Sequence, residues 1–89
     1  MTFITKEAIS MYYLYIIQCK DQSLYTGITT DITRRVKEHS TGKGGKYTRS
    51  KRPVKLVYQE EYEDRSKAQS RESEIKAWNR SKKLQLIQK

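Results

Sequence analysis

Residues 12–28, with the sequence YYLYIIQCKDQSLYTGI, decide the fold of this chain. Aromatic and β-branched side chains dominate residues 12–19, which is typical of a strand. Because these residues are apolar at successive as well as alternate positions, we expect a strand covered on both faces, at the centre of a sheet. Residues 20–23 have turn chemistry and residues 24–28 resume the strand pattern. The stretch is therefore predicted to be a β-hairpin.

A helix is predicted after the hairpin. Thr29, Thr30 and Asp31 offer N-caps for a helix that carries Ile32, Val36 and His39 on one stripe, and Gly42 would end it. Residues 40–53 are rich in small and cationic residues and are predicted to be a loop.

The rest of the chain completes an α+β fold. A third strand is expected at residues 56–62, a helix from Asp64 to about Trp78, and a short closing segment at residues 84–87. The predicted architecture is a three-stranded antiparallel sheet flanked by helices, in the order β-β-α-β-α.

Length and composition predict one small domain. The chain has 89 residues, and residues 11–89 are expected to form the domain. Residues 1–10 lack periodicity and are expected to be an N-terminal extension and a candidate for disorder. A single cysteine, Cys19, cannot build a disulfide framework, so an intracellular, cytoplasmic location is expected. No apolar run approaches the ~20 residues of a membrane span. We expect a monomer with no membrane partner.

Positive charge is clustered along the chain. The formal net charge is +9, which points to nucleic acid or another anionic surface. Between residues 34 and 55 Glu38 is the only acid. A solvated cationic face is the competing interpretation. The candidate nucleic-acid-binding residues in this run are Arg34, Lys43, Lys46, Arg49, Lys51 and Arg52.

Glu72 stands out on the predicted second long helix. Positions 68, 72 and 75 share a helical face, and Ala68 and Ile75 make that face apolar. A carboxylate there is costly unless it is paired or bound to a metal. One carboxylate with water in the other positions is a common way to hold Mg²⁺. A salt bridge to a nearby cation is the alternative interpretation.

Arg35 and His39 lie one helical turn apart on the first predicted helix. Arg35 could neutralise charge that develops on a phosphate, or could only position a phosphate. His39, the one histidine, could exchange a proton with a tyrosine hydroxyl or a water, or could only cap the helix. Tyr15 and Tyr25 lie on the two hairpin strands, where packing and base stacking are alternatives to chemistry.

Taken together, these residues resemble the GIY-YIG endonuclease superfamily, and especially its small stand-alone, single-domain group. The resemblance extends to the nuclease domain of bacterial excision repair. Tyr13-Leu14-Tyr15 stands at the first motif of that family and Tyr25-Thr26-Gly27 at the second. Tyr13 replaces a glycine and Thr26 an isoleucine, both at non-catalytic positions. Matches to the arginine, histidine and glutamate of the family are Arg35, His39 and Glu72.

The resemblance implies a role for each residue. Glu72 would hold one divalent metal, Mg²⁺ or Mn²⁺. Tyr25 would act as or assist the general base, and Tyr15 would orient water or phosphate. Arg35 would stabilise developing charge, and His39 would tune Tyr25 or the water. Further candidate site residues are Tyr13, in the first motif, and Asn79, which shares the predicted helical face of Glu72.

Two functions follow. The first is a metal-dependent DNA endonuclease, with branched, nicked or damaged DNA as candidate substrates in repair or recombination and RNA left open. The second is a non-catalytic nucleic-acid-binding module with the same fold. Glu72 favours the enzyme, because an anion that faces the site would repel the phosphates of a simple binding partner.

Overall fold

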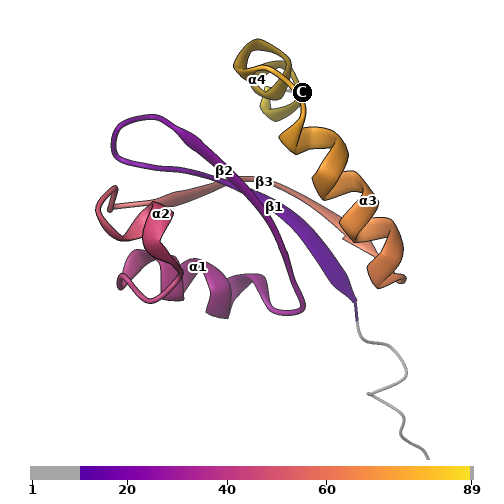
Figure 1. Cartoon of the computed structure of the whole chain (residues 1–89). Helices are drawn as coiled ribbons and strands as arrows, with labels where there is room; N and C mark the ends of the chain where they lie inside the picture. The colour runs from indigo at the N-terminus through magenta and orange to yellow at the C-terminus, as the bar shows by residue number, and fades with distance from the viewer. Residues whose placement is uncertain (1–10, 89) are drawn as a thin grey trace, which may run out of the picture.

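The computed structural model describes residues 11–88, apart from the side chains of Lys46 and Tyr47. The expectation for residues 1–10 lies outside the described residues. Figure 1 shows the elements in chain order, which are β1 (Tyr12–Gln18), β2 (Leu24–Thr29), α1 (Ile32–Ser40), α2 (Lys46–Arg49), β3 (Lys55–Tyr62), α3 (Arg65–Lys76) and α4 (Arg80–Ile87).

The three strands form one antiparallel sheet in the order β2-β1-β3. This confirms the predicted α+β class and the hairpin, and it puts β1 at the centre. Leu14, Ile16 and Ile17 of β1 are fully buried. Their burial explains why the strand is apolar at successive positions, since both of its faces are covered.

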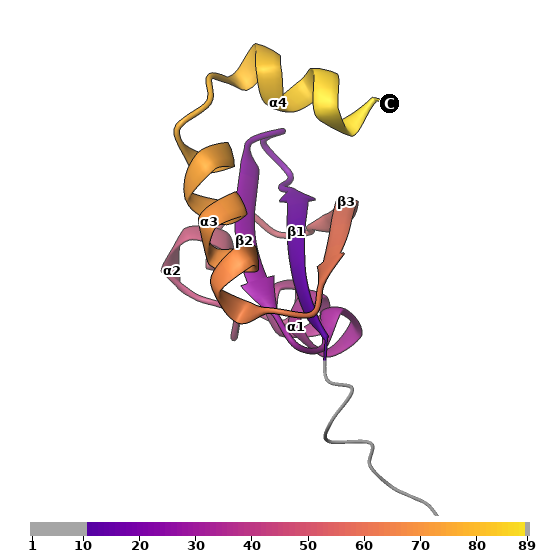
Figure 2. The ribbon, with the colours of Figure 1, turned by 90° about the vertical axis from the view of Figure 1, so that its right-hand side faces the viewer.

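Helices cover the two faces of the sheet, with α1 and α2 on one side and α3 on the other (Figure 1). Figure 2 shows α3 running along β2, and α4 beyond the C-terminal end of α3. On the α3 side, Leu14 and Ile16 pack with Ile75 in the core. Tyr15, between them in sequence, faces the α1 side because side chains alternate along a strand. Alternate side chains of β1 therefore face different surroundings: one set packs in the apolar core, and Tyr15 faces a polar site on the other side of the sheet.

An aspartate caps each of the helices α1 and α3; Asp31 is one of the three candidates before α1, and Asp64 begins the later helix as expected. The Asp31 side chain accepts from the backbone N–H of Arg34 at 3.0 Å, and the Asp64 side chain accepts from that of Ser66 at 2.8 Å. These bonds satisfy orphan donors of α1 and α3 and fix where each helix begins. Gly42, with φ +85°, follows the end of α1, as expected for a residue that stops a helix.

Three expectations differ from the structure. The predicted loop at residues 40–53 contains the short helix α2. The helix from Asp64 ends at Lys76 rather than near Trp78, and the closing segment is a separate helix, α4. The reason is Asn79, whose side chain accepts from the backbone N–H of Lys82 at 2.9 Å and caps α4. None of the described helices is long and apolar enough to cross a bilayer.

A polar cluster fixes α3 against β3. The Arg71 guanidinium donates to both carboxylate oxygens of Glu60, with Nε to Oε1 and Nη2 to Oε2 both at 3.0 Å. The hydroxyls of Tyr58 and Tyr62 also donate to Glu60. Burial raises the pKa of Glu60, but Arg71 and the two tyrosines outweigh it and hold that pKa below its usual range. The cluster is a fully paired polar contact at the edge of the core.

Removal of Arg71 should cost stability. In Arg71→Met, Glu60 keeps two tyrosine donors but loses its counter-ion, so we expect the free energy of unfolding to fall by about 2 kcal/mol. The measurement is urea denaturation followed by circular dichroism. Arg65→Met, on the exposed first turn of the same helix, is the matched control and should change stability by less than about 0.5 kcal/mol. Equal effects of the two substitutions would contradict the assignment.

Candidate active site

Tyr15 lies at the centre of the candidate site. Its side chain is 1% exposed, and Gly27 of β2 is its partner across the strands. A Cβ on Gly27 would lie 2.6 Å from the Tyr15 hydroxyl oxygen. Only a glycine leaves room for the ring there. The glycine of the Tyr25-Thr26-Gly27 motif is therefore needed to admit the tyrosine of the Tyr13-Leu14-Tyr15 motif.

His39 meets both tyrosines from the last turn of α1. Its Nε2 lies 3.0 Å from the Tyr15 hydroxyl oxygen, in a buried hydrogen bond. Its ring centroid is 5.2 Å from that of Tyr25, in an edge-on arrangement. The Tyr15 and Tyr25 ring centroids are 6.4 Å apart. Three predicted site residues thus form one packed group.

The loop around α2 closes this group from the other side. Thr48 is fully buried and its Oγ1 lies 2.8 Å from His39 Nδ1. A Cβ on Gly44 would lie 2.3 Å from that same Nδ1, so the Gly44 backbone packs directly on the imidazole. Sequence reasoning assigned no role to Thr48 or Gly44. No periodicity marks them, and the glycine-rich loop is the one signal that could have pointed to a close backbone approach.

Arg35 connects α1 to the same loop. Its Nη1 donates to Glu38 at 2.8 Å and its Nη2 donates to the Gly44 carbonyl at 3.0 Å. The charge of Arg35 also acts on the Tyr15 hydroxyl. Burial raises the pKa of Tyr15, and Arg35 partly opposes that rise, while Tyr25 and Glu72 add to it. Arg35 is half-buried, so it can meet an anion that approaches Tyr15.

Glu72 lies on α3, and its negative charge is the smallest of the influences that act on the pKa of Tyr15. Its carboxylate Oε2 is 3.1 Å from Lys76 Nζ, one turn further along α3. The same ammonium lies 6.0 Å from the centroid of the Tyr25 ring. The Glu72 side chain is 22% exposed. Glu72 is thus a half-buried carboxylate, and its ion-pair partner is a lysine with a long, flexible side chain.

The structure does not bring Tyr13 and Asn79 into this group. Tyr13 lines a separate groove with Asp31, Leu56 and Glu61. The helical-face argument for Asn79 is wrong, because α3 ends at Lys76 and Asn79 caps the next helix. A catalytic part for either residue stays a prediction.

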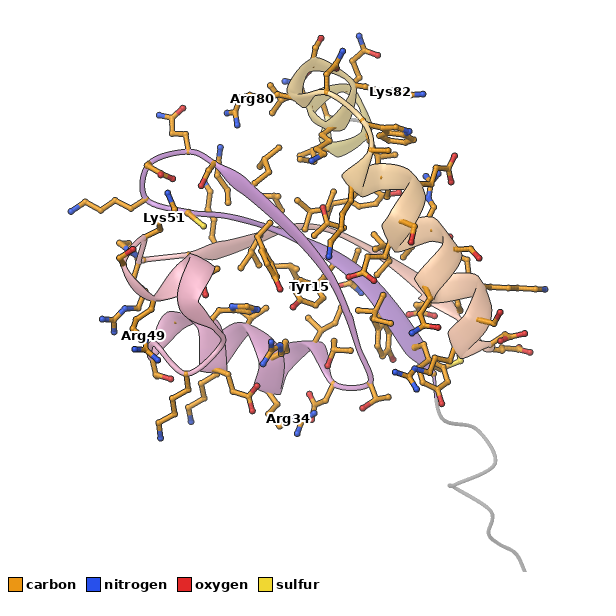
Figure 3. All side chains as sticks on the ribbon, in the orientation of Figure 1. Tyr15, Arg34, Arg49, Lys51, Arg80 and Lys82 are labelled. Atoms are coloured by element: carbon orange, nitrogen blue, oxygen red, sulfur yellow. The ribbon has the colours of Figure 1, made fainter. Side chains whose placement is uncertain are left out.

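The candidate nucleic-acid-binding cations lie around α1 and α2. Figure 3 shows Arg34, Arg49 and Lys51 at this end of the molecule, apart from Arg80 and Lys82 on α4. Lys51 donates to Asp21 at 2.8 Å, which ties it to the turn of the hairpin. The side chain of Lys46 lies outside the described residues. The other predicted residues of this run are exposed, namely Arg34, Lys43, Arg49 and Arg52.

Comparison with known proteins identifies the family of this chain. The family model described as the GIY-YIG catalytic domain matches residues 11–85. The chain belongs to the GIY-YIG family.

Relatives within the family are small proteins of the UPF0213 group. A UPF0213 protein of Haloquadratum walsbyi is 56% identical over 86% of this chain and 86% of its own length. One of Staphylococcus haemolyticus is 52% identical over 86% of this chain and 94% of its own. The solution structure of a UPF0213 protein from Bacillus halodurans matches with a TM-score of 0.59 and 46% identity, over 88% of this chain and 83% of that one.

GIY-YIG membership implies a divalent metal, and the donor set fits one held by a single carboxylate. In the part of the chain that the structure describes, no group of three or more His, Cys, Asp or Glu side chains could form a protein cage. Mg²⁺ commonly binds through one or two carboxylates and keeps several waters. Glu72 is half-buried, and its partner Lys76, which lies 6.0 Å from the Tyr25 ring centroid, is a group that a cation could displace. The residue fits a GIY-YIG metal ligand.

The buried state of His39 predicts a pH-dependent stability. Burial and the Arg35 charge lower the pKa of His39, and Glu38 opposes them. The unfolded chain then binds the proton more readily than the folded one, so the contribution of His39 is full above about pH 6.5 and is lost as the pH falls below it. Tyr15 and Tyr25 from the sheet and Thr48 from α2 complete its surroundings.

The measurement is urea denaturation of wild type and His39→Gln at about pH 7.5 and about pH 5.5. Carboxylates titrate alike in both proteins, so the difference between the two free energies of unfolding isolates His39. We expect the wild type to lose more stability than the variant on acidification. A difference that stays constant between the two pH values would refute the buried neutral imidazole.

Proposed function

We propose that this protein is a divalent-metal-dependent endonuclease that hydrolyses phosphodiester bonds in DNA. Branched, nicked or damaged DNA encountered in repair or recombination is the proposed substrate class. One observation carries the proposal, namely the convergence of His39, Arg35 and the charge of Glu72 on the buried hydroxyl of Tyr15. A surface that only binds phosphate has no need for a buried tyrosine–histidine pair.

Proton transfer is the first task of the site. Tyr15 is better placed than Tyr25 to accept the proton of an attacking water, because its own proton has His39 Nε2 as an acceptor at 3.0 Å. The lowered pKa of His39 keeps the imidazole neutral at pH 7 and able to accept. The raised pKa of Tyr15 disfavours a free phenolate, so the two transfers would occur together. Tyr25 then packs beside the pair and assists in orienting the water.

Charge stabilisation is the second task. Arg35 lies next to the Tyr15 hydroxyl, and it can exchange its bond to Glu38 for one to the scissile phosphate. Glu72 would bind the metal after release from Lys76. Held by Glu72, a divalent ion would supply Lewis-acid stabilisation of the negative charge that develops during hydrolysis.

The ion pair of Glu72 with Lys76 changes the comparison with a non-catalytic binding module. A carboxylate that is paired with a lysine repels phosphate only weakly. The presence of Glu72 is therefore weaker evidence for an enzyme over a binding module than an unpaired carboxylate would be. The enzyme is favoured by the hydrogen bond between Tyr15 and His39, because a hydroxyl and an imidazole in contact are suited to proton transfer.

Glu72→Gln should abolish metal-dependent cutting. We expect at least about a hundredfold loss of cleavage of labelled linear, nicked and branched DNA with Mg²⁺ or Mn²⁺, since the amide loses the charge that holds the metal. Glu74→Gln is the matched control, because Glu74 is on the same helix but pairs with Arg71 on the surface. Undiminished cutting in Glu72→Gln would sink the metal assignment. Salt-sensitive binding without cutting of any substrate in the wild type would favour the binding module.

Binding of DNA should depend steeply on salt. Replacement of both Lys43 and Arg49 by Gln should lower the slope of log affinity against log salt by about 1 for each lost contact. Fluorescence anisotropy of a labelled duplex over a salt series measures this slope. Lys67→Gln is the control, because Lys67 lies beside Glu61, Glu63 and Asp64 and should leave the slope unchanged. If the double substitution left the slope unchanged, DNA would bind to a surface that does not include Lys43 and Arg49.

A further inference from the structure

Thr48 is a buried polar side chain that the proposed chemistry has not used. It lies on α2, in the basic loop, and is 0% exposed. Its Oγ1 is 2.8 Å from His39 Nδ1, while the other imidazole nitrogen, Nε2, is 3.0 Å from the Tyr15 hydroxyl. The imidazole is therefore held at both nitrogens by neutral hydroxyl groups, each of which can donate or accept. The direction of the two bonds decides which nitrogen carries the proton.

Arg35 bears on that direction. A guanidinium has only donors, so Arg35, whose charge acts on the Tyr15 hydroxyl, cannot accept the Tyr15 proton. The hydroxyl proton of Tyr15, which is 1% exposed, then has His39 Nε2 as its acceptor. A neutral imidazole has one donor and one acceptor nitrogen. Nδ1 therefore carries the proton and donates to Thr48 Oγ1.

Each tautomer leaves one of the two hydroxyl protons without an acceptor among the contacts of the described residues. That proton belongs to Tyr15 when Nε2 is protonated, and to Thr48 when Nδ1 is protonated. A phenol, with an ordinary pKa of about 10, is a stronger hydrogen-bond donor than the aliphatic alcohol of threonine. The acceptor nitrogen of the imidazole therefore takes the Tyr15 proton, which selects the Nδ1–H tautomer.

We propose that Thr48 is a positioning residue that holds His39 in its Nδ1–H tautomer, with Nε2 facing Tyr15 as the proton acceptor. The use of this tautomer in cleavage rests on the proposed function, but the tautomer itself does not. When the proton of Tyr15 moves to Nε2, the imidazole becomes a cation and Nδ1–H continues to donate to Thr48 Oγ1. The residue acts through His39 and does not touch the substrate.

The position of Thr48 also connects the acceptor to the basic loop. Arg49 follows it directly, and Gly44, whose carbonyl accepts from Arg35, packs on the same imidazole. The short segment that would contact a nucleic acid is therefore also the segment that orients His39.

The test uses nitrogen NMR on the substrate-free protein. His39 is the only histidine of the chain, so long-range proton–nitrogen spectra of ¹⁵N-labelled protein report its tautomer without assignment ambiguity. We expect the Nδ1–H form in wild type and in Thr48→Ser, which keeps the hydroxyl. Thr48→Val keeps the shape but cannot accept, so we expect a shift toward the Nε2–H form. A wild-type spectrum of the Nε2–H form would overturn the proposal, even if Thr48→Val failed to fold.

Cleavage assays add a second readout. We expect Thr48→Val to lower kcat about ten- to a hundredfold with KM little changed, and Thr48→Ser to restore most of the rate. A folded Thr48→Val protein with an unchanged tautomer would also refute the role of Thr48. If no DNA substrate is cut by the wild type while the tautomers behave as expected, the proposed nuclease function fails and the assignment of Thr48 stands.

Discussion

The buried hydroxyl of Tyr15 is the constraint on which the rest of the structure depends. Burial of a hydroxyl is unfavourable unless it is hydrogen-bonded, so His39 must lie beside it. The ring occupies the space that a Cβ on Gly27 would need, which accounts for the glycine in β2. His39 in turn requires Thr48 and the close backbone of Gly44. The hairpin, α1 and the α2 loop are thus joined through one side chain.

Much of this fold could be predicted because its signals are local. The apolar run of β1, the N-caps Asp31 and Asp64 and the stop at Gly42 act within a few residues, and each lies where the structure has it. Asn79 shows the limit. Its sequence context allowed either continuation of α3 or a cap, and it caps α4. Local propensity does not decide between those outcomes, because the packing of Leu86 and Ile87 on the core contributes as well.

The candidate site could be predicted in part for a related reason. The functional groups of five candidate side chains can be read from the sequence, namely Tyr15, Tyr25, Arg35, His39 and Glu72. The structure packs Tyr15, Tyr25 and His39 together, and the charges of Arg35 and Glu72 act on Tyr15. Thr48 and Gly44 could not be found in that way. A threonine and a glycine in a basic loop are common, and only the three-dimensional contact with His39 distinguishes them. Likewise, the pairing of Glu72 with Lys76 is one of many that a chain rich in cations allows.

Stability and function are linked differently on the two sides of the sheet. On α3, adjacent residues point about 100° apart around the helix, so Arg71, fixed to Glu60, also sets the direction of Glu72. A change in the Arg71–Glu60 pair should therefore alter the position of Glu72, the proposed metal ligand, without any contact to it. On the α1 side, the same hydroxyl and imidazole groups satisfy burial and carry the proposed chemistry. A substitution on that side is therefore expected to lower stability and the proposed activity together. Only isosteric changes such as Thr48→Val can distinguish the two effects.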